Sequence, residues 1–99
     1  MIDLRENKIE RLPARFGNLR KLLRLNLDSN NLQQLDTNFA DLRSLQDLSL
    51  AKNRISHIVE DCLTWLQNLV MLDLHENRLT EFTAVPKSPK LDTLSLSFN

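Results

Sequence analysis

The sequence predicts an α/β repeat solenoid, with short parallel strands on a concave face and irregular, 3-10 or short helical returns on the convex face. The first observation behind this prediction is an asparagine that recurs at separations of 23, 23, 24 and 22 residues, as Asn7, Asn30, Asn53, Asn77 and Asn99. The second is a Leu/Ile-x-Leu unit shortly before each asparagine. A period of this length marks an array in which each repeat is one supersecondary unit that only its neighbours bury.

The period also sets the domain organisation, which is a single domain over residues 1–99. It consists of a partial repeat 1–21, whole repeats 22–44, 45–68 and 69–90, and a partial repeat 91–99. Both ends stop inside the pattern, without a polar capping unit. Because a terminal strand exposes unpaired hydrogen-bonding groups and an apolar layer, we expect a chain truncated at both ends, with neighbouring repeats or caps outside it.

Each Leu/Ile-x-Leu unit is predicted to form a short strand. In residues 25–27 the apolar side chains alternate with period two, so both leucines point to one side and Asn26 to the other. Repeats stacked in register place such strands side by side as a parallel sheet, about 4.8 Å apart. Parallel neighbours need a crossover, and residues 32–45 supply one on the opposite face.

The return segments differ from one another. Residues 12–19 and 35–42 place a phenylalanine four positions after a leucine. Residues 58–66 hold one position more and have the spacing of one or two helical turns. Residues 80–90 form a short return with two prolines, so we expect irregular, extended backbone there.

The recurring asparagine is predicted to be structural. Its amide carries two donors and an acceptor, so one side chain can pair with backbone groups of its own loop and of the adjacent loop. Aspartate would lack the donors, and leucine would lack both functions. A column of such amides would satisfy the buried backbone at every layer of the array.

The spacing of leucines and asparagines is similar to that of a known family. The run Leu22-x-x-Leu25-x-Leu27-x-x-Asn30-x-Leu32 resembles the leucine-rich repeat, and the resemblance covers essentially the whole chain. It implies a rigid, curved platform that binds proteins. Residues 12–19 are similar to the Ras-group intracellular scaffolds, although those more often carry Ile where this chain has Phe16. The longer return over residues 58–66 is similar to repeats of extracellular receptors.

Composition excludes several other classes of protein. Thirteen basic and thirteen acidic residues balance, so no overall positive field is available to hold nucleic acid. No apolar run approaches the length that spans a membrane, which predicts no membrane insertion in this segment. A single cysteine, no Asn-x-Ser/Thr site and no signal peptide favour the cytoplasm, with an extracellular location left open.

The outward-pointing strand residues are the predicted partner-binding surface on the concave face. They are Arg24, Asn26, Asp28, Asp47, Ser49, Ala51, Met71, Asp73, His75, Thr93 and Ser95. Neighbouring strands predict three exposed ion pairs, namely Arg5 with Asp28, Arg24 with Asp47, and Lys52 with Glu76. The carboxylates left over are Asp3, Glu6, Asp73 and Asp92. We therefore expect a mildly acidic face that receives a basic or mixed-polarity protein segment, with Met71 as the apolar anchor.

Four other residues invite a functional interpretation. His75 has two acidic neighbours, but one histidine on an open sheet does not make a metal site. Cys62 lacks a histidine partner and is expected to pack on the convex side. Trp65 is expected to lie partly buried against the adjacent repeat, with an exposed lateral contact as the alternative. Phe98 is expected beside the core of a longer protein.

The predicted function is a non-enzymatic protein–protein interaction module, a scaffold that binds a protein partner in intracellular signalling. The sequence shows no nucleophile–base pair, phosphate loop or metal-ligand spacing, so we expect no catalytic residue, metal or cofactor in these residues. Two alternatives stay open. One is part of an extracellular or cell-surface recognition receptor. The other is the sensor arm of a kinase, ligase or phosphatase whose catalytic domain lies outside this chain.

Overall fold

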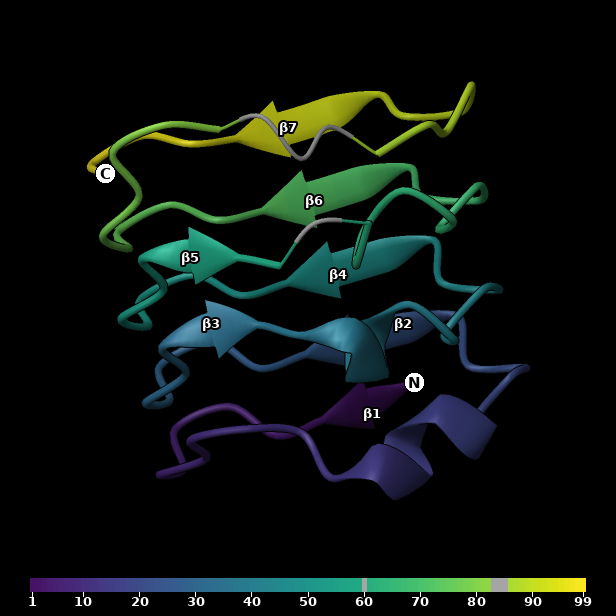
Figure 1. Cartoon of the computed structure of the whole chain (residues 1–99), viewed down its shortest axis with the longest axis horizontal. Helices are drawn as coiled ribbons and strands as arrows, with labels where there is room; N and C mark the ends of the chain where they lie inside the picture. The colour runs from purple at the N-terminus through teal and green to yellow at the C-terminus, as the bar shows by residue number, and fades with distance from the viewer. Residues whose placement is uncertain (60, 83–85) are drawn as a thin grey trace.

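The strands of the repeats form one parallel sheet. The computed structural model describes residues 1–59, 61–82 and 86–99, and its five-stranded sheet has the order β1-β2-β4-β6-β7 (Figure 1). The strands are β1 (Ile2–Asp3), β2 (Arg24–Asn26), β4 (Asp47–Ser49), β6 (Met71–Asp73) and β7 (Thr93–Ser95), and every pair is parallel. The predicted solenoid of short parallel strands is confirmed.

The register places equivalent apolar residues of successive repeats in one column. Leu25 pairs with Ile2 on one side and with Leu48 on the other, and the column continues through Leu72 and Leu94. The three central leucines of this column are buried. Because side chains alternate along a strand, the residues between the leucines point away from the core and form the surface of the sheet.

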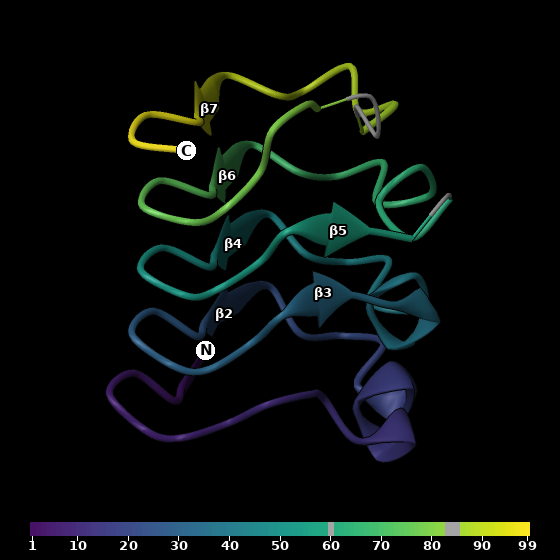
Figure 2. The ribbon, with the colours of Figure 1, turned by 60° about the vertical axis from the view of Figure 1, so that its left-hand side comes forward.

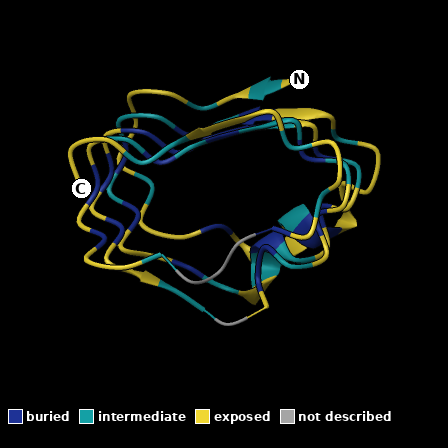
Figure 3. Ribbon diagram, turned by 90° about the horizontal axis from the view of Figure 1, so that it is seen from above, coloured by how far each residue is buried: buried dark blue, intermediate teal, exposed yellow. Residues whose placement is uncertain are grey.

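The returns lie opposite the sheet and close the core (Figure 3). The first two contain short 3-10 helices, η1 (Ala14–Asn18) and η2 (Thr37–Phe39), which contact each other. Asp36 caps η2, because its carboxylate accepts a hydrogen bond from the backbone N–H of Asn38. The core between sheet and returns consists of leucines with Ile55, Phe39 and Cys62.

The third return is a series of turns, and the helical spacing of residues 58–66 does not produce a helix in its described residues. Residues 61–65 are turns, held by bonds from the Cys62 N–H to the Val59 carbonyl and from the Leu66 N–H to the Leu63 carbonyl. Asp61 has a φ of 68°, which breaks the run of right-handed backbone that a helix needs. The fourth return, over the described residues 80–82 and 86–90, contains only irregular backbone and turns.

A second, two-stranded sheet was not predicted. It pairs β3 (Gln34–Leu35) with β5 (His57–Ile58) in parallel, between the main sheet and the returns (Figure 2). Each of these strands begins only a few residues after the recurring asparagine of its repeat. The stacking of the loops that contain these asparagines therefore also brings the two strands into register. Among the described residues, no helix is long and apolar enough to span a bilayer.

The turn after each strand of the main sheet contains one residue with left-handed backbone. The residue before each recurring asparagine has a φ between 55° and 60°, and these residues are Glu6, Ser29, Lys52, Glu76 and Phe98. None is glycine, although left-handed backbone costs other residues about 1–2 kcal/mol. Since the φ values are nearly equal, the turn has the same geometry at every layer and places each asparagine in the same position.

Candidate partner-binding face

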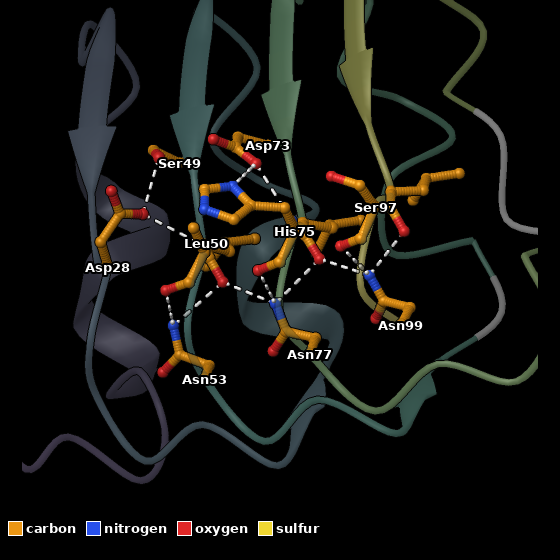
Figure 4. A network of polar contacts seen from close by, with 12 residues as sticks. Asp28, Ser49, Leu50, Asn53, Asp73, His75, Asn77, Ser97 and Asn99 are labelled. Carbon is orange, nitrogen blue, oxygen red and sulfur yellow. Dashed lines mark hydrogen bonds and ion pairs between the residues drawn. The ribbon is translucent and has the colours of Figure 1, made fainter.

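The recurring asparagines stack in line and bond each turn to its neighbour (Figure 4). The Asn53 Nδ2 donates to the carbonyls of Leu50 and Ala51 in its own loop, at 3.0 and 3.2 Å, and to that of Leu27 in the preceding repeat, at 3.0 Å. Its Oδ1 accepts from the Leu32 N–H at 3.1 Å. Each layer is thus tied to the one before it by bonds in both directions.

The same four bonds recur at Asn30, Asn77 and Asn99. Asn30, Asn53 and Asn77 are buried, whereas Asn7 is exposed and bonds only to carbonyls of its own loop. The inner members of the ladder therefore have more buried partners to satisfy than the first one.

A second row of polar side chains bonds each repeat to the next at the turns that lead into the strands, and we call this row the second ladder. We call these turns the pre-strand edge (residues 18–23, 41–46, 65–70 and 86–92). The Ser44 hydroxyl donates to the Arg20 carbonyl, and the Asn68 Nδ2 donates to the Arg43 carbonyl at 2.9 Å. The Ser88 hydroxyl bonds to the carbonyls of Gln67 and Leu69. Side chains of different types fill these positions, so no single recurring residue signals this ladder in the sequence.

The outward-pointing residues of β2, β4, β6 and β7 and of the turns after them form the sheet face, the surface predicted to be concave. Most of the predicted partner-binding residues are exposed or half-buried on it, namely Arg24, Asn26, Asp28, Asp47, Met71, Asp73, His75, Thr93 and Ser95. Ala51 is a correction, because only 1 % of its surface is exposed and its side chain cannot contact a partner. Ser49 is also buried, and its hydroxyl bonds to the Asp28 carboxylate at 2.6 Å.

The ion pairs on this face differ in part from those predicted. The Arg24–Asp47 pair is confirmed, at 3.3 Å. Arg5 does not pair with Asp28; it bonds to Asp3 two residues before it, at 2.9 Å. These hydrogen bonds lower the pKa of Asp3 and raise the pKa of Arg5. Within the described ranges, Lys52 and Glu76 form no ion pair, so the third predicted pair is wrong.

Asp28 and Asp73 form hydrogen bonds that the sequence did not predict. The Asp28 carboxylate accepts from the Ala51 N–H at 2.8 Å as well as from Ser49, so it stabilises the turn after the neighbouring strand. Asp73, predicted to lack a partner, lies with its Oδ1 2.6 Å from the His75 Nδ1 and accepts from the His75 N–H (Figure 4). Several polar side chains of this face therefore form hydrogen bonds that stabilise the turns after the strands.

A shallow hollow of about 240 Å³ lies on the sheet face around Met71. Met1 supplies the other exposed apolar side chain of its lining, and the Arg24–Asp47 pair forms part of its rim. This hollow is where the sheet face combines an accessible apolar surface with charged groups at its border.

Comparison with known proteins decides the family. The family described as "Leucine rich repeat" matches this sequence twice, over residues 25–79 and over residues 43–99. The chain belongs to the leucine-rich repeat family. A comparison with curated proteins gave no match. Leucine-rich repeats are protein–protein interaction modules, so binding of a protein is the general function of this chain.

His75, the histidine of the sheet face, contacts Asp73 on the leucine-rich repeat surface. In the described part of the chain, no hydrogen bond joins His75 to a hydroxyl or a thiol, and no three His, Cys, Asp or Glu side chains lie together as metal ligands would. His57, the other histidine, lies in β5 on a different surface. Trp65 is 51 % exposed in the third return, so it is partly buried as predicted and also accessible from outside, and Phe98 is 80 % exposed in its turn.

Cys62 lies in the core of the leucine-rich repeat, and we predict that it makes stability fall at alkaline pH. Burial, with a smaller contribution from Asp36, raises the pKa of the Cys62 thiol to about 12. Above pH ~9 the unfolded thiol loses its proton while the folded one keeps it, so the folded state becomes less favourable by about 1.4 kcal/mol per pH unit. Chemical denaturation between pH 9 and 10.5 should show the unaltered chain losing about 1.5 kcal/mol more than the Cys62→Ala variant. Equal losses in the two chains would contradict this role of Cys62.

Proposed function

We propose that this leucine-rich repeat binds an extended segment of a partner protein across its sheet face, with one apolar side chain of the partner seated against Met71. The hollow around Met71 carries the proposal. Met71 is half-buried, so its position is fixed by packing while part of its surface stays accessible. Binding energy at protein interfaces concentrates in a few such desolvated apolar contacts.

Charge favours a basic segment. The sheet face and the adjoining first strand with its turn include four carboxylates and two guanidinium groups, namely Asp3, Asp28, Asp47, Asp73, Arg5 and Arg24. The hydrogen bonds that hold Asp28 come from a hydroxyl and an amide, which leave its negative charge uncompensated. A partner segment with one apolar residue flanked by lysine or arginine would match both the hollow and this excess of negative charge. The cytoplasmic signalling role stays a prediction that rests on the sequence resemblance.

Selection from a random dodecapeptide library tests this proposal. We expect the recovered peptides to carry a central apolar residue and a net positive charge. Met71→Ala should weaken their binding about tenfold, which corresponds to about 1.4 kcal/mol and is typical of an anchor residue. Trp65→Ala is the matched control, because it removes a larger exposed apolar side chain from the third return, outside the hollow around Met71. Equal affinities of the Met71→Ala variant and the unaltered chain would contradict the proposal.

A further inference from the structure

Five cations lie along the pre-strand edge. They are Arg20, Lys21, Arg43, Lys87 and Lys90, all of them exposed. Contacts between successive repeats place them on one edge. Ser44, beside Arg43, bonds to the Arg20 carbonyl, Asn68 bonds to the Arg43 carbonyl, and the Lys90 Nζ lies 3.1 Å from the Asn68 Oδ1.

These cations are available to a ligand. Asp41 and Asp92 are the acidic residues of this edge, and none of the ion pairs in the described part of the chain involves the five cations. Arg20, Arg43 and Asp41 line a hollow of about 190 Å³. The bonds of the second ladder fix the backbone that carries both arginines, so the site is preorganised. The chain is neutral overall, but five cations against two carboxylates make this edge positive, whereas the sheet face carries more carboxylates than cations.

We infer that the pre-strand edge binds an acidic protein segment that runs along the stack. From Arg20 to Lys90 there are three repeat steps of about 4.8 Å, or roughly 14 Å, which four or five residues of extended peptide would span. Arginine guanidinium groups bind carboxylates through paired hydrogen bonds. Leu23 lies beside Arg24 on the same edge and is 47 % exposed, so it offers an apolar contact within the row of cations.

The surroundings favour a short acidic peptide over other polyanions. A nucleic acid duplex or a membrane would extend beyond the row of cations onto Asp47 and Asp92, where it would meet like charge. The exposed aromatic residue of this edge, Trp65, lies in residues 65–70, which hold no cation that could bind the phosphate beside a stacked base. A peptide of a few residues is short enough to contact the row of cations without extending onto Asp47 and Asp92.

Titration with a defined peptide tests the inference. The probe is an acetylated heptapeptide with a central leucine and three glutamates on each side, and its glutamine counterpart serves as the ligand control. The unaltered chain should bind the glutamate peptide and not the glutamine peptide. Amide shifts in NMR spectra should change at residues 20–23, 43–46 and 90–92. The double variant Arg20→Gln/Arg43→Gln should weaken binding at least fivefold.

The control variant is Arg54→Gln/Arg78→Gln, which removes the same charge from the turns after the asparagines and should change affinity less than twofold. Met71→Ala should leave the affinity unchanged, which separates this surface from the sheet face. Equal weakening by the two arginine variants, or shifts confined to other residues, would overturn the inference. Tenfold tighter binding to phosphatidylserine vesicles or to a 12-nucleotide DNA strand would also overturn it, in favour of a membrane or a nucleic acid.

Discussion

Replacing Asn53 by leucine is expected to lower the free energy of unfolding by about 3 kcal/mol. The substitution removes four hydrogen bonds and leaves the Leu32 N–H without a partner in a buried layer. The carbonyls of Leu27 and Leu50 each lose one hydrogen bond and keep one, from Asn30 and Asn77. An orphaned buried polar group costs about 1–3 kcal/mol, and some relaxation of the loop will limit the sum. Urea denaturation at pH 7 measures the change.

Asn7→Leu is the matched control for this prediction. Asn7 occupies the same position of the first repeat but is exposed and bonds only to the carbonyls of Leu4 and Arg5, which water can solvate in its absence. We expect a loss below about 1 kcal/mol for this variant. Equal losses for the Asn53 and Asn7 variants would show that the ladder does not stabilise the inner layers as we describe.

Phe39→Ala should lower the free energy of unfolding by about 4 kcal/mol. Phe39 ends η2 and is 1 % exposed within the core, so its removal leaves a cavity that leucines on both sides cannot fill completely. Truncation of a buried phenylalanine typically costs 3–5 kcal/mol. The same denaturation experiment gives the value.

The preceding repeat provides the control for Phe39. Phe16 occupies the equivalent position in η1 but is only half-buried, so Phe16→Ala should cost about half as much. If the Phe39→Ala variant were as stable as the Phe16→Ala variant, the second return would not seal the core.

The strands and the ladder could be predicted because their signals are periodic. Alternation of leucines defines the strand direction, and in a stacked array every repeat must place its asparagine over the previous one. A single residue type at a fixed spacing therefore reports a contact between residues more than twenty positions apart, such as Asn53 and Leu32. The family match and the parallel order of the strands agree with this interpretation.

The details of the sheet face could not be predicted from register alone. Neighbouring strands bring Arg5 and Asp28 into the same column, yet Asp3 is closer to Arg5 along its own strand, and Asp28 bonds to the turn that contains Ala51. Hydrogen bonds within one repeat and to the turn of the next repeat compete with ion pairs between strands, and the outcome depends on side-chain rotamers that a sequence pattern does not specify. Ala51 is buried in that turn, and its N–H donates to the Asp28 carboxylate.

The returns show a similar limit. Residues 58–66 have helical spacing, but the left-handed backbone of Asp61 interrupts the run, and no helical period in the sequence reveals one such residue. The second sheet of β3 and β5 and the ladder of Ser44, Asn68 and Ser88 were missed because their positions hold different side chains in each repeat.

Hydrogen exchange of the unaltered chain tests the stacking of the repeats most directly. The Leu32 and Ile55 amides donate to the side chains of Asn53 and Asn77 from the next repeat, so only unfolding of the stack should expose them. We predict that both amides exchange at least about a thousandfold more slowly than in an unfolded peptide, with free energies close to that of global unfolding. Exchange of these two amides at the rate of an unfolded peptide, in a chain that otherwise remains folded, would contradict the account.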